Sequence, residues 1–223
     1  DGMGGLNCGD IASNIAISEL IMWFKCVPED WFLRERKIFT QLLGKLHEID
    51  QKVRENCYGG GTTLSIAIVT KNNTILTNIG DSRIYIDSNR GLIQVSRDST
   101  ISWELFEKGV IKNKDDIRFH KNNNLITSKL GGEKKRLNID VNVLENKNYN
   151  GIYLFSDGVT DCLSDLQLFS VIRSANFYEL AENIVDMAIF TDSENRNLNQ
   201  EFFYQNILGG KDNATAAVLT KKH

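Results

Sequence analysis

The stretch LSIAIV at residues 64–69 decides the fold class of this chain. Its alternate positions place apolar side chains on both faces of a strand, and β-branched residues favour that conformation. A strand that is apolar on both faces suits a sheet covered on one side by helices and on the other by a second sheet. Similar runs, separated by turn residues, predict an antiparallel meander over residues 62–70, 74–79, 83–86 and 92–95.

The segments on either side of this meander have helical spacing of their apolar residues. Upstream, the pattern predicts two helices over roughly 10–25 and 29–55, split at the only proline, Pro28. Downstream, we expect a short buried strand, three helices, the last of which ends at Gly209-Gly210, and a closing strand. Their expected ranges are 152–156 for the buried strand, 165–174, 177–190 and 195–208 for the helices, and 214–220 for the closing strand.

Residues 101–127 break the pattern of the surrounding chain. A short helix signal ends at Gly109, a polar run follows over 120–124, and an extended pattern resumes at 125–127. The polar run lacks the apolar periodicity that would fix it to a core. We therefore predict a flap at the sheet edge that opens at low free-energy cost compared with the sheets.

Composition sets the class of protein. The chain has 223 residues, of which 41% are hydrophobic and 25% charged, and its formal net charge is -3, so we expect a single domain over 1–223 and no nucleic-acid partner. No apolar run approaches the roughly 18 residues of a membrane span, and no signal peptide pattern begins the chain, which predicts a cytoplasmic protein without membrane insertion. The four cysteines form no C-x-x-C pair, so neither a zinc knuckle nor a disulfide framework is expected.

Four aspartates share one local context. Asp1, Asp81 and Asp157 each adjoin a glycine, Asp212 precedes Asn213, and all four lie at or beside an expected strand end. Taken singly, each pair is more often a plain turn. Together they predict a shared rim of carboxylates, which would repel one another unless protonated or bridged by cations. Oxygen ligands of this kind suit Mg²⁺ or Mn²⁺.

The blocks around these aspartates resemble, in order, the signature blocks of the type 2C family of metal-dependent serine/threonine protein phosphatases, in its bacterial form. The resemblance spans nearly the whole chain and rests on DGMGG at 1–5, GTT at 61–63, GDSR at 80–83, NLITSKLG at 124–131, SDGVTD at 156–161 and GKDNAT at 210–215. It implies an α+β fold, an αββα four-layer sandwich of two antiparallel β-sheets packed face to face and flanked by helices. That fold agrees with the changes of period along the chain.

The resemblance also implies a role for each matched residue. Asp1 would bridge two central Mn²⁺ or Mg²⁺ ions, Gly2 would offer a carbonyl to one of them, and Asp157 and Asp212 would complete the other. Asp81 would hold a third, weaker ion with Asp157, while Thr63 and Asn213 would support the ligands. The residues themselves indicate that Arg83, at the start of a strand, pins the neighbouring loop.

The implied activity is hydrolysis of phosphoserine and phosphothreonine esters by a metal-bridging water, with Asp1, Asp157 and Asp212 as the catalytic residues. The expected partners are phosphoprotein substrates of a serine/threonine kinase, and a monomer is expected. Met3 stands where many members have histidine, so water or another group must protonate the leaving oxygen.

Other classes of function remain open at this point. Family members carry upstream strands with a phosphate-gripping arginine and an acidic residue, and this chain begins after them, so we expect a fragment of a longer protein that lacks those strands. A catalytically impaired regulatory or binding module is the alternative. A nucleotide-binding protein is disfavoured, because the glycine-rich run 59–63 lacks the lysine of a P-loop and leads into a strand.

Overall fold

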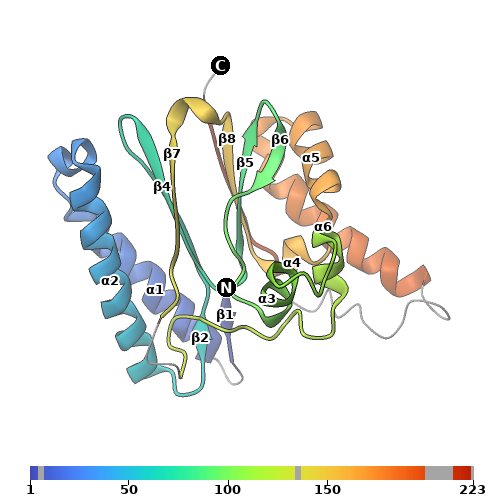
Figure 1. The fold of residues 1–223 in the computed structure, drawn as a ribbon, viewed down its shortest axis with the longest axis horizontal. Helices are drawn as coiled ribbons and strands as arrows, with labels where there is room; N and C mark the ends of the chain where they lie inside the picture. Colours follow the sequence, from blue (N-terminus) through green and yellow to red (C-terminus); the bar gives the residue numbers. More distant parts are fainter. Residues whose placement is uncertain (5–7, 134–136, 199–212, 222–223) are drawn as a thin grey trace. The chain divides into compact units, whose positions relative to one another are not determined.

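The computed structural model describes residues 1–4, 8–133, 137–198 and 213–221. The chain divides into two compact units. The first unit comprises Asp1–Gly80 and Thr127–Asn148, and the second comprises Asp81–Ile126 and Tyr149–His223. Each contains an antiparallel sheet with helices on one of its faces (Figure 1).

The sheet of the first unit is formed by β3 (Leu64–Val69), β4 (Asn73–Ile79) and β7 (Asp140–Glu145), in that order. A separate antiparallel pair joins β1 (Gly2–Met3) to β2 (Gly61–Thr62). The helices of this unit are α1 (Cys8–Lys25), the 3-10 helix η1 (Glu29–Leu33) and α2 (Glu35–Asn56). A short 3-10 helix, η3 (Asn146–Asn148), ends the unit.

The core of the first unit lies between α2 and one face of the sheet. One stripe of α2, spaced by three or four residues, is fully buried: Ile38, Leu42, Leu46, Ile49 and Val53. From β3 the alternate residues Leu64, Ile66 and Ile68 join the same cluster. The decisive stretch 64–69 is therefore a strand, as its pattern predicts.

The two upstream helices are confirmed with one difference. Residues 29–33, predicted to begin the second helix, form a 3-10 helix, and α2 begins only at Glu35. Arg34 lies between them with φ −121° and ψ 69°, outside the helical region, so the two segments cannot be continuous.

The sheet of the second unit has the order β6-β5-β8-β9. Its strands are β5 (Arg83–Ser88), β6 (Gly91–Gln94), β8 (Gly151–Phe155) and β9 (Ala216–Thr220). Its helices are α3 (Ile101–Glu107), η2 (Lys114–Phe119), α4 (Asp157–Thr160), α5 (Asp165–Ser174), η4 (Phe177–Glu179) and α6 (Leu180–Leu198). Aromatic residues of β5 and β8, among them Tyr85 and Phe155, form the core with Leu168 of α5 and Ile184 of α6.

Strand β5 carries three polar side chains on the face that it turns to this core. Arg83, Tyr85 and Asp87 occupy alternate positions, so they share one face. Tyr85 donates its hydroxyl proton to Asp165 Oδ1 at 2.8 Å, and Asp87 Oδ1 accepts from Arg173 Nη2 at 2.7 Å. Both partners belong to α5, the acid in its first turn and the base in its last, where the helix dipole favours each charge.

Arg83 pairs with Asp98, in the segment after β6. Its Nη2 and Nε lie 2.7 and 2.8 Å from Asp98 Oδ2, and the two side chains are only 9% and 2% exposed. Gln94 Nε2 donates to the other carboxylate oxygen at 2.7 Å. Burial alone would lower the pKa of Arg83, but the adjacent carboxylate raises it, so the guanidinium stays charged. The prediction that Arg83 pins a neighbouring loop agrees with this contact.

Two predictions about the sheets are corrected. The four early strands do not form one meander, because they belong to two sheets. In the first, β4 pairs with β3 and β7, and in the second, β5 pairs with β6 and β8. The chain changes sheet at Gly80-Asp81-Ser82. Strand β7 was not predicted, because its sequence DVNVLE mixes polar and apolar residues and most of them are partly exposed.

The helices near the end of the chain also differ from the prediction. Residues 180–198 form one helix, α6, where a break between 190 and 195 was expected. Residues 199–208 and Gly209-Gly210 lie outside the described residues. None of the helices in the described part of the chain is both long and apolar enough to cross a membrane.

We predict that Glu19→Gln destabilises the first unit in a pH-dependent way. Glu19, 13% exposed, lies 2.8 Å from Lys45 Nζ and also pairs with Lys52, and these hydrogen bonds lower its pKa to about 2. The ionised pair therefore contributes about 1 to 2 kcal/mol. The contribution is complete above the unfolded-state pKa of about 4.5 and is lost as the pH falls towards about 2.

Urea unfolding of the wild type and the variant at pH 7 and pH 3 measures this difference. The matched control is Glu48→Gln, which removes a 72% exposed carboxylate from the same lysine. A difference in stability between wild type and Glu19→Gln that is the same at pH 3 as at pH 7 would contradict the assignment.

We also predict that Arg83→Met lowers the free energy of unfolding by about 3 to 5 kcal/mol, because it leaves the buried Asp98 carboxylate without its charge partner. The double variant Arg83→Met/Asp98→Leu should recover much of that loss. Equilibrium urea unfolding of the three proteins decides the point. If the double variant is as unstable as the sum of the single changes, the two side chains do not act as a pair.

Candidate functional site

Asp1 and Gly2 are placed by backbone contacts within the first unit. The carbonyl oxygen of Asp1 accepts from the backbone N–H of Thr63 at 2.9 Å and from the hydroxyl of Thr62 at 2.7 Å. Gly2 pairs with Thr62 in the β1–β2 ladder. A Cβ atom at Gly2 would lie 2.1 Å from the carbonyl oxygen of Gly9, at the start of α1, so only glycine fits there.

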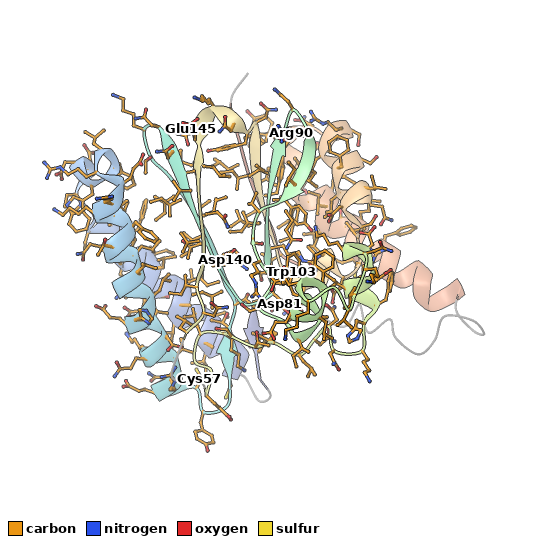
Figure 2. All side chains as sticks on the ribbon, in the orientation of Figure 1. Cys57, Asp81, Arg90, Trp103, Asp140 and Glu145 are labelled. Atoms are coloured by element: carbon orange, nitrogen blue, oxygen red, sulfur yellow. The ribbon has the colours of Figure 1, made fainter. Side chains whose placement is uncertain are left out.

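Asp81 follows the point where the chain leaves β4. Gly80 adopts φ +99°, and a Cβ atom there would lie 2.5 Å from Thr63 Cγ2, which explains why the turn needs glycine. Asp81 itself is buried, at the end of the β5–β6 hairpin opposite to Arg90 (Figure 2). Burial, together with the negative charges of Asp157 and Asp98, raises the pKa of Asp81 to about 8.

Asp157 begins the short helix α4, directly after β8 and Ser156. Its Oδ1 accepts from the backbone N–H of Gly158 at 2.8 Å. Burial raises the pKa of Asp157, and this hydrogen bond partly opposes the rise. A Cβ atom at Gly158 would lie 2.8 Å from the carbonyl oxygen of Asn213, so the glycine allows two backbone segments to approach closely.

Two further aspartates belong to the same acidic cluster of the second unit, which we define as Asp81, Asp98, Asp157 and Asp161. Asp161 lies one helical turn after Asp157, and burial with the Asp157 charge raises its pKa to about 6. Both of its carboxylate oxygens accept from Asn123 Nδ2 at 3.2 Å. Neither Asp98 nor Asp161 was singled out from the sequence. The signal for Asp161 was its i, i+4 spacing from Asp157 within SDGVTD.

The structure brings some of the predicted ligands together. Asp81 and Asp157 lie within electrostatic reach of each other in the second unit, whereas Asp1 and Gly2 belong to the first unit. Asp212 lies outside the described residues. Next to it, the carbonyl oxygen of Asn213 accepts from the Ser156 hydroxyl at 3.2 Å, which ties this part of the chain to the residue before Asp157.

No group of three or more His, Cys, Asp or Glu side chains converges closely enough to hold a metal ion among the residues that the structure describes. The full ligand set of Asp1, Gly2, Asp81, Asp157 and Asp212 therefore stays a prediction. The chemistry of the described donors still restricts the choice of ion. They are carboxylate and carbonyl oxygens, which suit hard divalent cations such as Mg²⁺ and Mn²⁺, and they include no thiolate or imidazole of the kind common in zinc and copper sites.

The predicted flap corresponds to residues 101–126 of the second unit, and we use "the flap" for this range. Its two ends meet, because the Ile101 N–H donates to the Leu125 carbonyl at 3.0 Å and Thr100 bridges to Ile126. Ile117 of η2 is fully buried. The flap thus has an apolar anchor and polar contacts to the rest of the unit, and its opening at low free-energy cost stays a prediction.

Comparison with known proteins gives the family of the chain. Residues 1–199 match the family model described as protein phosphatase 2C. The serine/threonine phosphatase stp of Listeria welshimeri is 28% identical over 228 residues, covering 99% of this chain and 82% of that protein. The protein phosphatase PhpP of Streptococcus pneumoniae is 29% identical over 229 residues, covering 99% and 83%.

Solved structures give the same fold. The serine/threonine phosphatase Stp1 from Staphylococcus aureus superposes with a TM-score of 0.82 at 23% identity, covering 100% of this chain and 82% of that one. The catalytic domain of the serine/threonine protein phosphatase PstP, solved in complex with 2 manganese ions, has a TM-score of 0.71 at 25% identity, with 98% and 83% covered. The predicted fold class, the αββα sandwich with two antiparallel sheets flanked by helices, is confirmed by this likeness.

The order of the aspartate blocks in the sequence, the family model and the bacterial relatives all indicate the same family. The resemblance drawn from the sequence blocks is thereby confirmed. The chain belongs to the protein phosphatase 2C family of serine/threonine phosphatases, in its bacterial form.

Proposed function

We propose that this chain hydrolyses phosphoserine and phosphothreonine in protein substrates and that it needs Mn²⁺ or Mg²⁺ to do so. The observation that carries the proposal is the acidic cluster of the second unit, in a chain whose relatives are named serine/threonine phosphatases. Carboxylates that raise one another's pKa are stabilised as anions by a shared cation. Two manganese ions are present in the related PstP structure, which supports this choice of ion.

The residues that we propose as metal ligands are those at the predicted positions. Asp1 and Gly2 would be held by the β1–β2 pair, Asp157 by its place at the start of α4, and Asp212 would complete the set. Asp81 would take part in a third, weaker site with Asp157. Bound divalent cations would supply the polarisation of the phosphoryl group and a water of lowered pKa.

The protein side chains would then orient the metal ligands and supply the negative charge that attracts the cations. Asp157 is oriented by the Gly158 N–H, so one of its oxygens has a fixed direction. Asp161 is held by Asn123, and its negative charge would help to attract a cation to the position beside Asp157. Met3 offers no titratable group, so water or another group would protonate the leaving seryl or threonyl oxygen.

The alternative of a catalytically impaired regulatory or binding module has no support from the comparisons, since the relatives are named as phosphatases. We retain as proposals a substrate that is phosphorylated by a serine/threonine kinase, a monomeric state and a cytoplasmic location. The chain spans 82% of the length of the Listeria welshimeri relative, and the proposal concerns this span.

We predict that hydrolysis of a phosphothreonine peptide stops when the divalent ions are removed. The donors are oxygen atoms, and none of them can replace the cation as the electrophile that polarises the phosphoryl group. Phosphate release should fall to background in excess chelator and return on addition of Mn²⁺. Full turnover in the presence of chelator would overturn the proposed function.

We further predict that Asp157→Asn reduces kcat by about 100-fold or more while the thermal unfolding midpoint changes little, because the substitution removes a charged ligand at nearly constant shape. Calorimetric titration with Mn²⁺ should show weaker binding. The matched control is Asp115→Asn, which changes the same functional group at an exposed position of η2. Similar losses in both variants would show that Asp157 has no special role.

A further inference from the structure

We propose that Lys114 is a positioning residue for substrate selection, because it ties the flap to Asp165 and Tyr85 at the base of α5. This inference rests on the proposed phosphatase function. It concerns which phosphoproteins reach the acidic cluster, and it assigns no part in bond breaking to Lys114. Lys114, Asp165 and Tyr85 all belong to the second unit.

Asp165 has contacts that do not involve the flap. It occupies the first turn of α5, which starts with a capping box between Ser164 and Gln167. The hydroxyl of Tyr85, a fully buried residue of β5, donates to its Oδ1 at 2.8 Å. The capping box thus fixes the turn that carries Asp165, and Tyr85 of β5 fixes one carboxylate oxygen, while Oδ2 accepts from a second donor.

Lys114 of the flap supplies that second donor. Its Nζ lies 2.7 Å from Asp165 Oδ2 and 5.5 Å from the centre of the Tyr85 ring. The ammonium therefore contacts the carboxylate and the aromatic ring of one preformed pair. Burial opposes ionisation of Asp165, yet Lys114 lowers its pKa, so the pair is charged at neutral pH.

A second tie joins the same flap to the acidic cluster. Asn123 Nδ2 donates to both oxygens of Asp161, which lies four residues before Asp165 on the chain. Ile117, fully buried, lies between Lys114 and Asn123 in the flap sequence. Residues 114–123 of the flap are therefore held at Lys114, at Ile117 and at Asn123. The contact of Asn123 is with Asp161, which follows the proposed ligand Asp157 by four residues.

The partial exposure of the Lys114–Asp165 pair indicates that it affects local opening of the flap more than global unfolding. The two side chains are 30% and 34% exposed, so solvent screens the pair and its effect on global unfolding is small. It nevertheless spans the flap and α5, which are far apart in sequence, and loosening it would change the local opening of the flap. That change would alter the binding of a substrate large enough to contact the flap, whereas the binding of a small phosphate ester would stay the same.

Hydrogen exchange of the whole chain tests the tie itself. Lys114→Met keeps the aliphatic stem and removes the charge, and amides of residues 114–126 should then exchange about two- to fivefold faster. Asp165→Asn should give a similar increase, and the double variant should add little to either single change, since both remove one contact. Lys112→Met, at an exposed position of the same segment, is the control and should change nothing.

Kinetics test the consequence for substrate choice. In Lys114→Met, KM for a phosphothreonine peptide should rise about two- to fivefold, with KM and kcat for a small aryl phosphate unchanged, and Lys114→Arg should restore the wild-type value. Equal changes on both substrates, additive effects in the double variant or exchange rates that match those of Lys112→Met would overturn the proposal. A wild-type chain that cleaves neither substrate with Mn²⁺ would overturn the proposed function, and the exchange data would still decide whether the tie exists.

Discussion

The second unit depends on one constraint, which is that strand β5 places charged and hydroxyl groups on the face that packs against the helices. Each of these groups is buried, so each must have a partner, because an unpaired buried polar group is costly. Satisfying Arg83 fixes the segment after β6, and satisfying Tyr85 and Asp87 fixes both ends of α5. The same network therefore sets the helix layer, the base of the flap and the direction in which the chain enters β5 from Asp81.

The acidic cluster differs from this network in its balance of charge. The partners of Arg83, Tyr85 and Asp87 balance charge inside the protein, whereas burial and neighbouring negative charge raise the pKa of Asp81 and Asp161 above their ordinary values. A protein can tolerate such a cluster if protons or cations neutralise it. Asp98 belongs to both sets, because it pairs with Arg83 and its negative charge also raises the pKa of Asp81. Among the other aspartates, the contrast distinguishes Asp87 and Asp165, which have cationic partners, from the candidate functional residues Asp81 and Asp161.

The sequence predicts much of this structure and misses parts of it for physical reasons. Helical spacing and the stretch 64–69 identify α2 and β3, because both are buried against one core and their patterns are strong. The pairing of β5 with β8 could not be predicted from the local sequence pattern, since β8 lies more than 60 residues later. The pattern of a strand indicates which of its faces is buried, but it does not specify the strand with which it pairs. The site aspartates could be found by their glycine context, but the importance of Asp98 and Asp161 appears only when their burial and neighbours are known.

The contact between Gly2 and Gly9 has a consequence for how the first unit can vary. The two backbones approach so closely that a methyl group on Gly2 would overlap the Gly9 carbonyl oxygen. No side chain lies between them to absorb a shift, so a displacement of the beginning of α1 is passed to Asp1 and Gly2 without damping. An axial shift of α1 would therefore move the first proposed ligand, whereas a change in a side chain on the exposed face of α1 would leave this backbone contact in place.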